Sequence, residues 1–458
     1  MLTAAPGAAV QTGPLTGSQA AFLGLSGYQW LVVAAGWAGW GFDVYDAVLF
    51  NFVARNCIPV LLHLPPDSPA ARSAVVFWNG VITSTLLVGW ALGGFVFGLV
   101  ADRIGRKRAL FVTIALYALG TSACALAGNL TQLILCRAVA ALGIGGEWGV
   151  GASLVAEAVP ENRRVEAGVI MQTGSPLGVV LASGVNYLIS GVWFAGQPQI
   201  AWRYVFLAGL LPVLLALLVR IFLRESEQWR ASRARGASSG PRELFAPAVR
   251  AATWGGLFAA AVAILCWWGC NAFVPLLGGS LSVHEAQRLG LAPPQAQALA
   301  AAWQAHASNA FNLGGLLGTF AAIPLALHLG RRPMFSVYFL YSALALFATF
   351  GLPLEPYTRL SLLLLVGAGV YGIFGAFTFY LPELFPVRIR ATGAGFCYNT
   401  GRVLAALGPL LIGWVSSAAG GSAEALMHVL LWLGVVPLAA ALLSRFLIVE
   451  TRGRTLPA

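Results

Sequence analysis

The chain has 458 residues, of which 59% are hydrophobic and only 9% are charged, and its formal net charge is +11. An ordinary soluble domain is about one quarter charged, so this composition excludes a water-soluble fold and indicates membrane-spanning helices. The positive charge does not indicate a nucleic-acid partner, because it is almost entirely Arg placed between apolar runs, where it sets membrane topology.

Twelve apolar runs follow a start at residues 1–27 that is rich in Ala, Gly, Thr and Ser, contains no Lys or Arg, and is expected to be a flexible tail. In chain order they are 28–51, 73–100, 109–127, 131–158, 165–191, 203–223, 251–276, 298–327, 333–351, 358–380, 391–417 and 425–447. Each is close to, or longer than, the roughly 20 residues that an α-helix needs to cross a bilayer. The sequence therefore predicts an all-α integral membrane protein with twelve transmembrane helices, in six-helix bundles at 28–223 and 251–447.

The Arg residues between these runs predict the orientation of the chain. Most of them fall in the segments 103–108, 163–164, 220–250, 331–332, 388–390 and 445–454. Basic residues are enriched on the cytoplasmic side of membrane proteins, so these segments and both termini are expected there. Residues 224–250 then form a cytoplasmic linker, with cytoplasmic tails at 1–27 and 448–458, in a multi-pass protein of the inner (plasma) membrane.

The segments outside the apolar runs carry no pattern of catalytic chemistry. They contain no nucleophile triad, phosphate loop or cluster of metal ligands. We therefore expect no enzymatic activity, no metal and no cofactor. The expected partners are the lipid bilayer and a small-molecule substrate, and the expected state is a monomer.

The loop after the second run has the sequence GLVADRIGRKR, Gly98 to Arg108. It resembles the cytoplasmic loop signature of the major facilitator superfamily of transporters. The resemblance implies that Gly98, Asp102, Arg103, Gly105 and Arg106 belong to a latch that holds the outward-facing state. In the second half Leu327 stands where the acidic residue of this loop belongs, so a latch there is expected to be weaker or built differently.

Two further segments match each other at corresponding places in the two halves. Glu157, Pro160 and Arg163 follow the fourth run, and PELFPVRIRATG, with Glu383 and Arg388, follows the tenth. The second segment resembles the pattern of sugar, organic-acid and sialate-type branches of the superfamily. We assign the acidic and basic residues of both segments to the predicted latch.

Other motifs resemble proton symporters of organic anions. Asp43 and Asp46 form a DxxD pair, and YNTGR ends at Arg402, both similar to aromatic-acid and sialate or lactate symporters, whereas the repeated Gln of sugar porters is absent from CWWGCNAFVPLL. The resemblance implies alternating access and proton-coupled symport of a monocarboxylate, aromatic acid or sialate-like anion. A sugar or drug carrier, or a non-transporting receptor, remains the alternative.

Five charged residues lie deep in the predicted spans: Asp43, Asp46, Glu147, Arg137 and Arg402. A charge at a helix centre costs about 2.5 to 3.5 kcal/mol on insertion scales, so each of them needs a partner or a water-filled path. Asp43, Asp46 and Glu147 are candidate proton carriers, and Arg137 lies in a stretch that resembles a proton-coupling motif. The alternative is structural, with the Asp pair bridged to Arg137 or Arg402.

Arg402 is the candidate substrate ligand, since a guanidinium offers a fork that matches a carboxylate. We expect additional hydrogen bonds to the substrate from six polar residues: Tyr45, Asn271, Gln304, His306, Tyr398 and Asn399. Single polar residues in membrane helices also serve as contacts between helices. Trp267 and Trp268 can stack on a substrate or face lipid.

Overall fold

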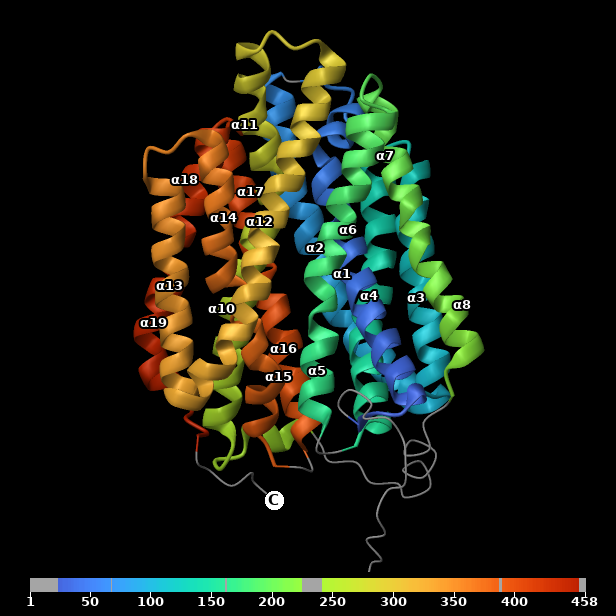
Figure 1. Ribbon diagram of the computed structural model, residues 1–458, viewed down its shortest axis with the longest axis vertical. Coiled ribbons are helices and arrows are strands. Elements are labelled where there is room, and N and C mark those ends of the chain that lie inside the picture. The colour runs from blue at the N-terminus through green and yellow to red at the C-terminus, as the bar shows by residue number, and fades with distance from the viewer. Residues whose placement is uncertain (1–23, 67, 161–162, 225–240, 387–388, 453–458) are drawn as a thin grey trace, which may run out of the picture.

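The computed structural model describes residues 24–66, 68–160, 163–224, 241–386 and 389–452, and within these ranges the regular elements are all helical. In this described part of the chain, twelve helical spans are long and apolar enough to cross a membrane. The predicted all-α, twelve-span architecture is therefore confirmed. Figure 1 shows the helix axes aligned roughly along the long axis of the molecule. The start of the first helix and the end of the last lie at the same face, called here the terminal face.

The first six spans, called here the N-terminal half, use eight α-helices. Their bounds are α1 Gly27–Leu61, α2 Pro69–Ile104, α3 Arg106–Ala123, α4 Leu130–Ala158, α5 Arg164–Gln172, α6 Gly174–Asn186, α7 Pro198–Leu207 and α8 Leu211–Phe222. Short helical turns η2 Cys124–Leu126, η4 Tyr187–Trp193 and η5 Ala208–Leu210 extend or join them.

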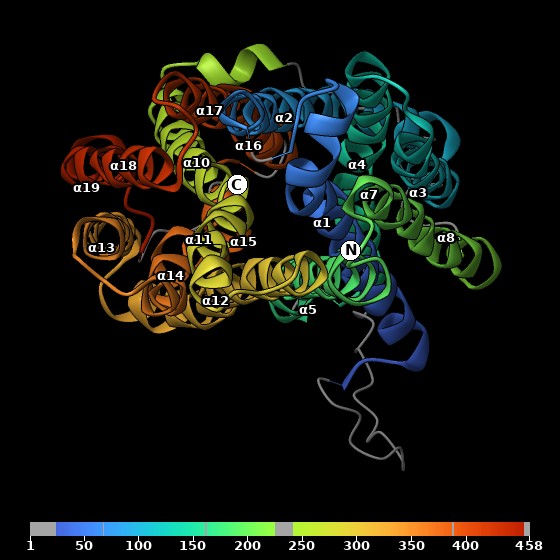
Figure 2. The ribbon, with the colours of Figure 1, turned by 90° about the horizontal axis from the view of Figure 1, so that it is seen from above.

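The last six spans form the C-terminal half, which follows a short turn, η6 Pro241–Phe245. Its helices are α10 Arg250–Asn271, α11 Val274–Arg288, α12 Pro293–His328, α13 Arg331–Gly351, α14 Pro356–Val370, α15 Phe374–Glu383, α16 Arg390–Ala405, α17 Leu407–Ala418, α18 Ala423–Leu433 and α19 Val435–Leu447. Figure 2 shows the two halves side by side, meeting where α2 lies against α16 and α17 and where α12 lies against the fifth span.

The first and seventh spans extend beyond the predicted apolar runs, to Leu61 and Arg288. Their extra turns contain polar residues, which an apolar-run criterion excludes. These turns pack on each other, because Arg55 on α1 donates a hydrogen bond of 2.5 Å to the carbonyl of Gly279 on α11. A contact between the halves therefore stabilises helix that hydropathy alone does not predict.

Proline explains why several spans are broken. Pro176, Pro275 and Pro409 stand at the second or third residue of α6, α11 and α17, directly after a break. A proline ring clashes with the carbonyl four residues earlier and has no N–H to give it, so the preceding helix ends there. At two of these breaks a side chain of the other half donates a hydrogen bond to a backbone carbonyl. Asn79 donates to the carbonyl of Ala272 at 2.8 Å, and Ser84 donates to that of Ala406 at 2.6 Å.

The halves are held together toward the face opposite the termini by a set of hydrogen bonds, called here the seam. It consists of Arg55 to Gly279 O, Ser73 to Ser417 O, Asn79 to Ala272 O, Ser84 to Ala406 O, Ser183 to Asn309 and Asn186 to Gln304. Gly80 of α2 also lies directly on α17, where a Cβ would come within 3.1 Å of the Cα of Gly413. Small residues thus allow close backbone contact along the seam.

Candidate functional site

Asp46 and Arg137 form a buried ion pair between α1 and α4. The Arg137 Nη1 atom lies 3.5 Å from Asp46 Oδ1, and both side chains are almost fully excluded from solvent. Arg137 also donates to the backbone carbonyls of Asp46 and Ala47, at 3.2 and 2.9 Å, and to the Thr121 hydroxyl at 3.1 Å. These contacts tie α1, α3 and α4 together at one level, which we call the Arg137 level.

Asp43, one turn before Asp46 on α1, contacts a different partner. Its carboxyl lies within hydrogen-bonding range of the carboxyl of Glu147 on α4, and both side chains are fully buried. Neither carboxyl accepts a hydrogen bond from an N–H or hydroxyl group of the described residues. Two carboxyls can hydrogen-bond only when one of them keeps its proton, so the pair is suited to hold a single shared proton.

The absence of a side chain at Gly39 leaves room for the Glu147 carboxyl beside Asp43. A Cβ at Gly39, one turn before Asp43 on α1, would collide with Glu147 Oε1 and lie 2.9 Å from its carboxyl carbon. Helix α4 can approach α2 and α3 just as closely, because Gly145 and Gly146 face those helices. The sequence GIGGE thus places an acidic side chain between tightly packed helices.

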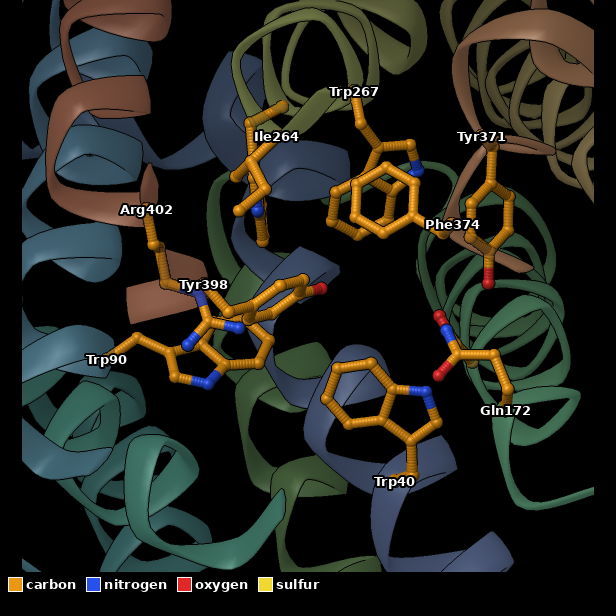
Figure 3. Close-up of a pocket in the computed structure, with 11 residues that line it drawn as sticks. Trp40, Trp90, Gln172, Ile264, Trp267, Tyr371, Phe374, Tyr398 and Arg402 are labelled. Atoms are coloured by element: carbon orange, nitrogen blue, oxygen red, sulfur yellow. The ribbon is translucent and has the colours of Figure 1, made fainter. Parts of the chain in front are cut away.

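A cavity lies between the halves, with walls from the first, second, fifth, seventh, tenth and eleventh spans (Figure 3). Its lining residues are Trp40, Trp90, Gln172, Ser175, Ile264, Trp267, Trp268, Tyr371, Phe374, Tyr398 and Arg402. The free space is about 10 Å³, which is room for about one water molecule. The site is contracted in this conformation, so its aromatic walls must move before a larger ligand enters.

Arg402 is the charged residue of this wall. It is 4% exposed, its Nη1 donates to Asn399 Oδ1 at 3.0 Å, and its guanidinium carbon lies 4.5 Å from the ring centre of Trp90 and 5.0 Å from that of Tyr398. Among the described residues it makes no ion pair with a carboxylate. Figure 3 shows Arg402 on one side of the cavity and Tyr371 and Gln172 on the other.

Four of the predicted substrate residues lie in other contacts. Tyr45 donates to the carbonyl of Ala208 at 2.9 Å, and Gln304 accepts from Asn186 across the seam at 3.1 Å. His306 stacks on Tyr357 with ring centres 4.5 Å apart and lies 3.0 Å from the Ser361 hydroxyl. Asn271 is buried at the end of α10. The structure therefore brings together Arg402, Tyr398 and Asn399, but it does not bring these four residues to the cavity wall.

Several lining residues are not singled out by the sequence: Trp40, Trp90, Gln172, Ser175, Tyr371 and Phe374. One signal could have indicated the fifth span, because Gln172 and Ser175 flank the helix break that Pro176 imposes. The aromatic residues carry no such signal. An apolar side chain in a membrane helix suits both lipid and a cavity wall, so only the fold distinguishes them.

The terminal face carries an ion pair within the C-terminal half. Arg331 binds Glu383 through two hydrogen bonds of 2.6 and 3.0 Å, and Thr451 donates to the same carboxylate at 2.5 Å. Glu450 accepts from the backbone N–H groups of Arg331 and Arg332, each at 3.0 Å. The degenerate loop at Leu327 is thus accompanied by a contact built from Arg331 and the predicted latch residue Glu383.

Glu450 lies beyond the last span, and backbone donors hold it in its charged form. Burial raises its pKa, but hydrogen bonds from the backbone N–H groups of Arg331, Arg452, Arg332 and Thr451 together outweigh burial, so its pKa lies below the usual range. The carboxylate is therefore ionised throughout the neutral pH range, and it orders the start of α13.

Most other residues of the predicted latch lie outside the described part of the chain. The surroundings of Gly98, the side chains of Asp102, Arg103, Arg106 and Glu157, and the whole of Arg388 are not among the described residues. Gly105 has φ of 101°, a backbone conformation that favours glycine, and it joins α2 to α3. Arg163 is partly buried beside the start of α5.

Substitution of Glu383 tests the latch assignment. We expect Glu383→Gln to lower the maximal transport rate about three- to tenfold with little change in the substrate concentration for half-maximal uptake, because Glu383 contacts Arg331 and not the cavity. Initial uptake rates in proteoliposomes measure both quantities. The matched control is Glu424→Gln, an exposed acid in the first turn of α18. An unchanged rate would remove Glu383 from the latch.

Comparisons with known proteins agree with this architecture. A family model described as "Sugar (and other) transporter" matches residues 45–275 and 306–458. The chain is 28% identical to a probable 4-methylmuconolactone transporter of Cupriavidus pinatubonensis, covering 91% of this chain and 90% of that protein. It is 30% identical to the cis,cis-muconate transport protein of Acinetobacter baylyi, covering 75% and 79%. The fold is similar to that of the xylose transporter XylE from Escherichia coli in a partially occluded inward-open conformation, with a TM-score of 0.72, 18% identity and coverage of 94% and 100%.

Proposed function

Because the chain belongs to the sugar (and other) transporter family of the major facilitator superfamily, we propose that it carries a small organic anion together with protons by alternating access. Family membership and twelve spans make it a multi-pass transporter of the plasma membrane. What we propose beyond family membership is that the substrate is negatively charged and that the coupling ion is a proton. We place the terminal face in the cytoplasm, as the distribution of Arg predicts.

The observation that carries the proposal is Arg402. A buried cation without a carboxylate partner is costly, and two ring faces, the Asn399 amide oxygen and the Tyr398 side chain compensate it only in part. A substrate carboxylate placed in the cavity would complete its coordination through two parallel hydrogen bonds. The aromatic walls suit the flat, unsaturated body of such an anion better than a sugar, whose hydroxyls need many hydrogen-bond partners.

The names of two relatives point in the same direction. One is described as a transporter of 4-methylmuconolactone and the other of cis,cis-muconate, and muconate is an unsaturated dicarboxylate. We infer that this chain accepts an anion of similar chemistry. Arg402, Tyr398 and Asn399 then form the anion end of the substrate site, and Trp267 and Trp268 belong to its aromatic wall.

For the coupling proton, we propose that the Asp43 and Glu147 pair is the carrier and that Asp46 with Arg137 is its structural neighbour. When the shared proton leaves, the net charge of the two carboxyls changes from minus one to minus two. The free energy of proton release therefore depends on the surrounding charges. Approach or withdrawal of Arg402 as the halves move would change that cost. Substrate binding at Arg402 and proton binding at the pair would thereby be coupled electrostatically.

Uptake by purified protein in proteoliposomes tests the function. When the outside is more acidic than the inside, we expect labelled benzoate or cis,cis-muconate to accumulate beyond the level in protein-free liposomes, and labelled xylose not to accumulate. For benzoate, a monovalent anion carried with one proton in an electroneutral cycle, the accumulation ratio is bounded by about tenfold per pH unit. If xylose accumulates and neither anion does, the anion assignment is wrong. If an anion equilibrates but never accumulates, the chain is a uniporter.

A further inference from the structure

Helix α3 faces the two carboxyl levels of α1. Both helices run from the terminal face to the opposite face, so one turn along α3 corresponds to one turn along α1. Thr121 on α3 accepts a hydrogen bond from Arg137 at the Arg137 level, where Asp46 lies. One turn back toward the terminal face, Tyr117 on α3 therefore lies level with Asp43 on α1.

The fourth span confirms this register. Gly143 on α4 packs directly on Tyr117, because a Cβ at Gly143 would lie 2.6 Å from the Tyr117 nitrogen and 3.0 Å from its Cβ. Glu147 follows Gly143 by one helical turn on the same face. Tyr117 also lies within electrostatic range of Asp43, Glu147 and Asp46. The tyrosine thus shares a closed space with the carboxyl pair.

The Tyr117 hydroxyl has no hydrogen-bond partner among the residues that the structure describes, although Tyr117 is 0% exposed. A buried hydroxyl without a partner destabilises a protein, and phenylalanine would fill the same space without that cost. Tyr338, by comparison, is a buried tyrosine whose hydroxyl donates to the carbonyl of Gly318 at 2.6 Å. The hydroxyl of Tyr117, buried beside the acids, is therefore expected to form a hydrogen bond in another state of the molecule.

We propose that the Tyr117 hydroxyl donates a hydrogen bond to the Asp43 and Glu147 pair after the pair has released its proton. This inference rests on the proposed proton coupling. While the pair holds one proton, the carboxyls hydrogen-bond each other and do not need the tyrosine. When the proton passes to water, two carboxylates remain and the bond between them is lost. Tyr117 keeps its own proton and stabilises the new negative charge as a donor.

Other groups face the pair, and their charges bear on the same equilibrium. They are Asp46 on α1, Arg137 on α4 and, across the interface, Arg402 on α16. Arg137 already donates to Asp46, to Thr121 and to two backbone carbonyls. Arg402 donates to Asn399 and lies in the cavity wall. Tyr117 is a donor at the level of the pair, and its hydroxyl has no bond to break among the described residues.

The test compares Tyr117→Phe with Tyr338→Phe in proteoliposomes, with cis,cis-muconate or benzoate as the probe anion. For Tyr117→Phe we expect unchanged or higher thermal stability, a clear loss of accumulation driven by a pH gradient, and a pH profile of exchange shifted to alkaline pH by about one unit or more. For Tyr338→Phe we expect lower thermal stability and the wild-type pH profile. A packing role for Tyr117 would not move the pH profile.

Two results would overturn the inference, and they differ from each other. If Asp43→Asn and Glu147→Gln abolish accumulation but Tyr117→Phe matches the wild type at every pH, the role of Tyr117 is wrong and the proton pair stands. If Asp43→Asn and Glu147→Gln also accumulate the probe like the wild type, the proton pair itself is wrong, and the role of Tyr117 falls with it.

Discussion

Neutralising either member of the carboxyl pair, by Asp43→Asn or Glu147→Gln, is expected to abolish accumulation of the probe anion while leaving exchange between equal compartments measurable. The variant cannot take up and release the shared proton, so the pH gradient no longer does work on the substrate. For benzoate, the carrier-dependent accumulation ratio at a gradient of one pH unit should fall from up to about tenfold to about one. Parallel measurements of net uptake and of exchange separate coupling from binding.

Two comparisons sharpen this experiment. Glu355→Gln changes an exposed acid at the start of α14 and should accumulate the probe like the wild type. Asp46→Asn should instead lower stability strongly, by about 3 to 5 kcal/mol, because it leaves the buried Arg137 without its carboxylate. Full accumulation by both Asp43→Asn and Glu147→Gln would show that a different group carries the proton.

Replacing Arg402 is expected to have the largest effect on substrate binding. Arg402→Lys retains the charge but loses the planar fork and its fit between the rings of Trp90 and Tyr398. We expect affinity for the probe anion to fall about tenfold in Arg402→Lys and on the order of a hundredfold or more in Arg402→Ala. Equilibrium binding of the labelled anion to purified protein measures this directly.

The matched control for Arg402 is Arg288→Lys, because the Arg288 side chain is 70% exposed at the end of α11. Its binding should equal that of the wild type. Thermal stability should be recorded for each variant, since Arg402 is buried and its loss can also disturb packing. If Arg402→Lys and Arg402→Ala both bind the probe normally, Arg402 does not recognise a carboxylate.

The spans could be predicted because each one must be apolar along its length, and that requirement is local in sequence. The departures from this prediction are not local: α1 and α11 continue through polar turns because Arg55 donates to the carbonyl of Gly279 in the other half. That partner lies far away along the chain. No pattern within a single span indicates it.

The site was harder to predict, because pairing depends on how neighbouring helices are aligned. The spacing of Asp43 and Asp46 predicts two acids on one face of α1, and the structure gives them different partners, Glu147 and Arg137. Sequence spacing within α1 does not determine how far α4 is shifted along its axis relative to α1. Tyr117 illustrates the same limit, since a tyrosine in an apolar run resembles ordinary packing until α3 is placed beside the acids.

The seam has a consequence for the speed of the transport cycle. Four of its hydrogen bonds end on backbone carbonyls, and Gly80 meets α17 without interlocking side chains. When the halves part, water can replace each lost donor, so each bond costs only about 1 kcal/mol net. The free-energy cost of separating the two halves at the seam is therefore small for each contact that is lost. We therefore expect the seam to contribute little to the barrier that limits turnover. The Arg331 and Glu383 pair lies within the C-terminal half and does not cross between the halves.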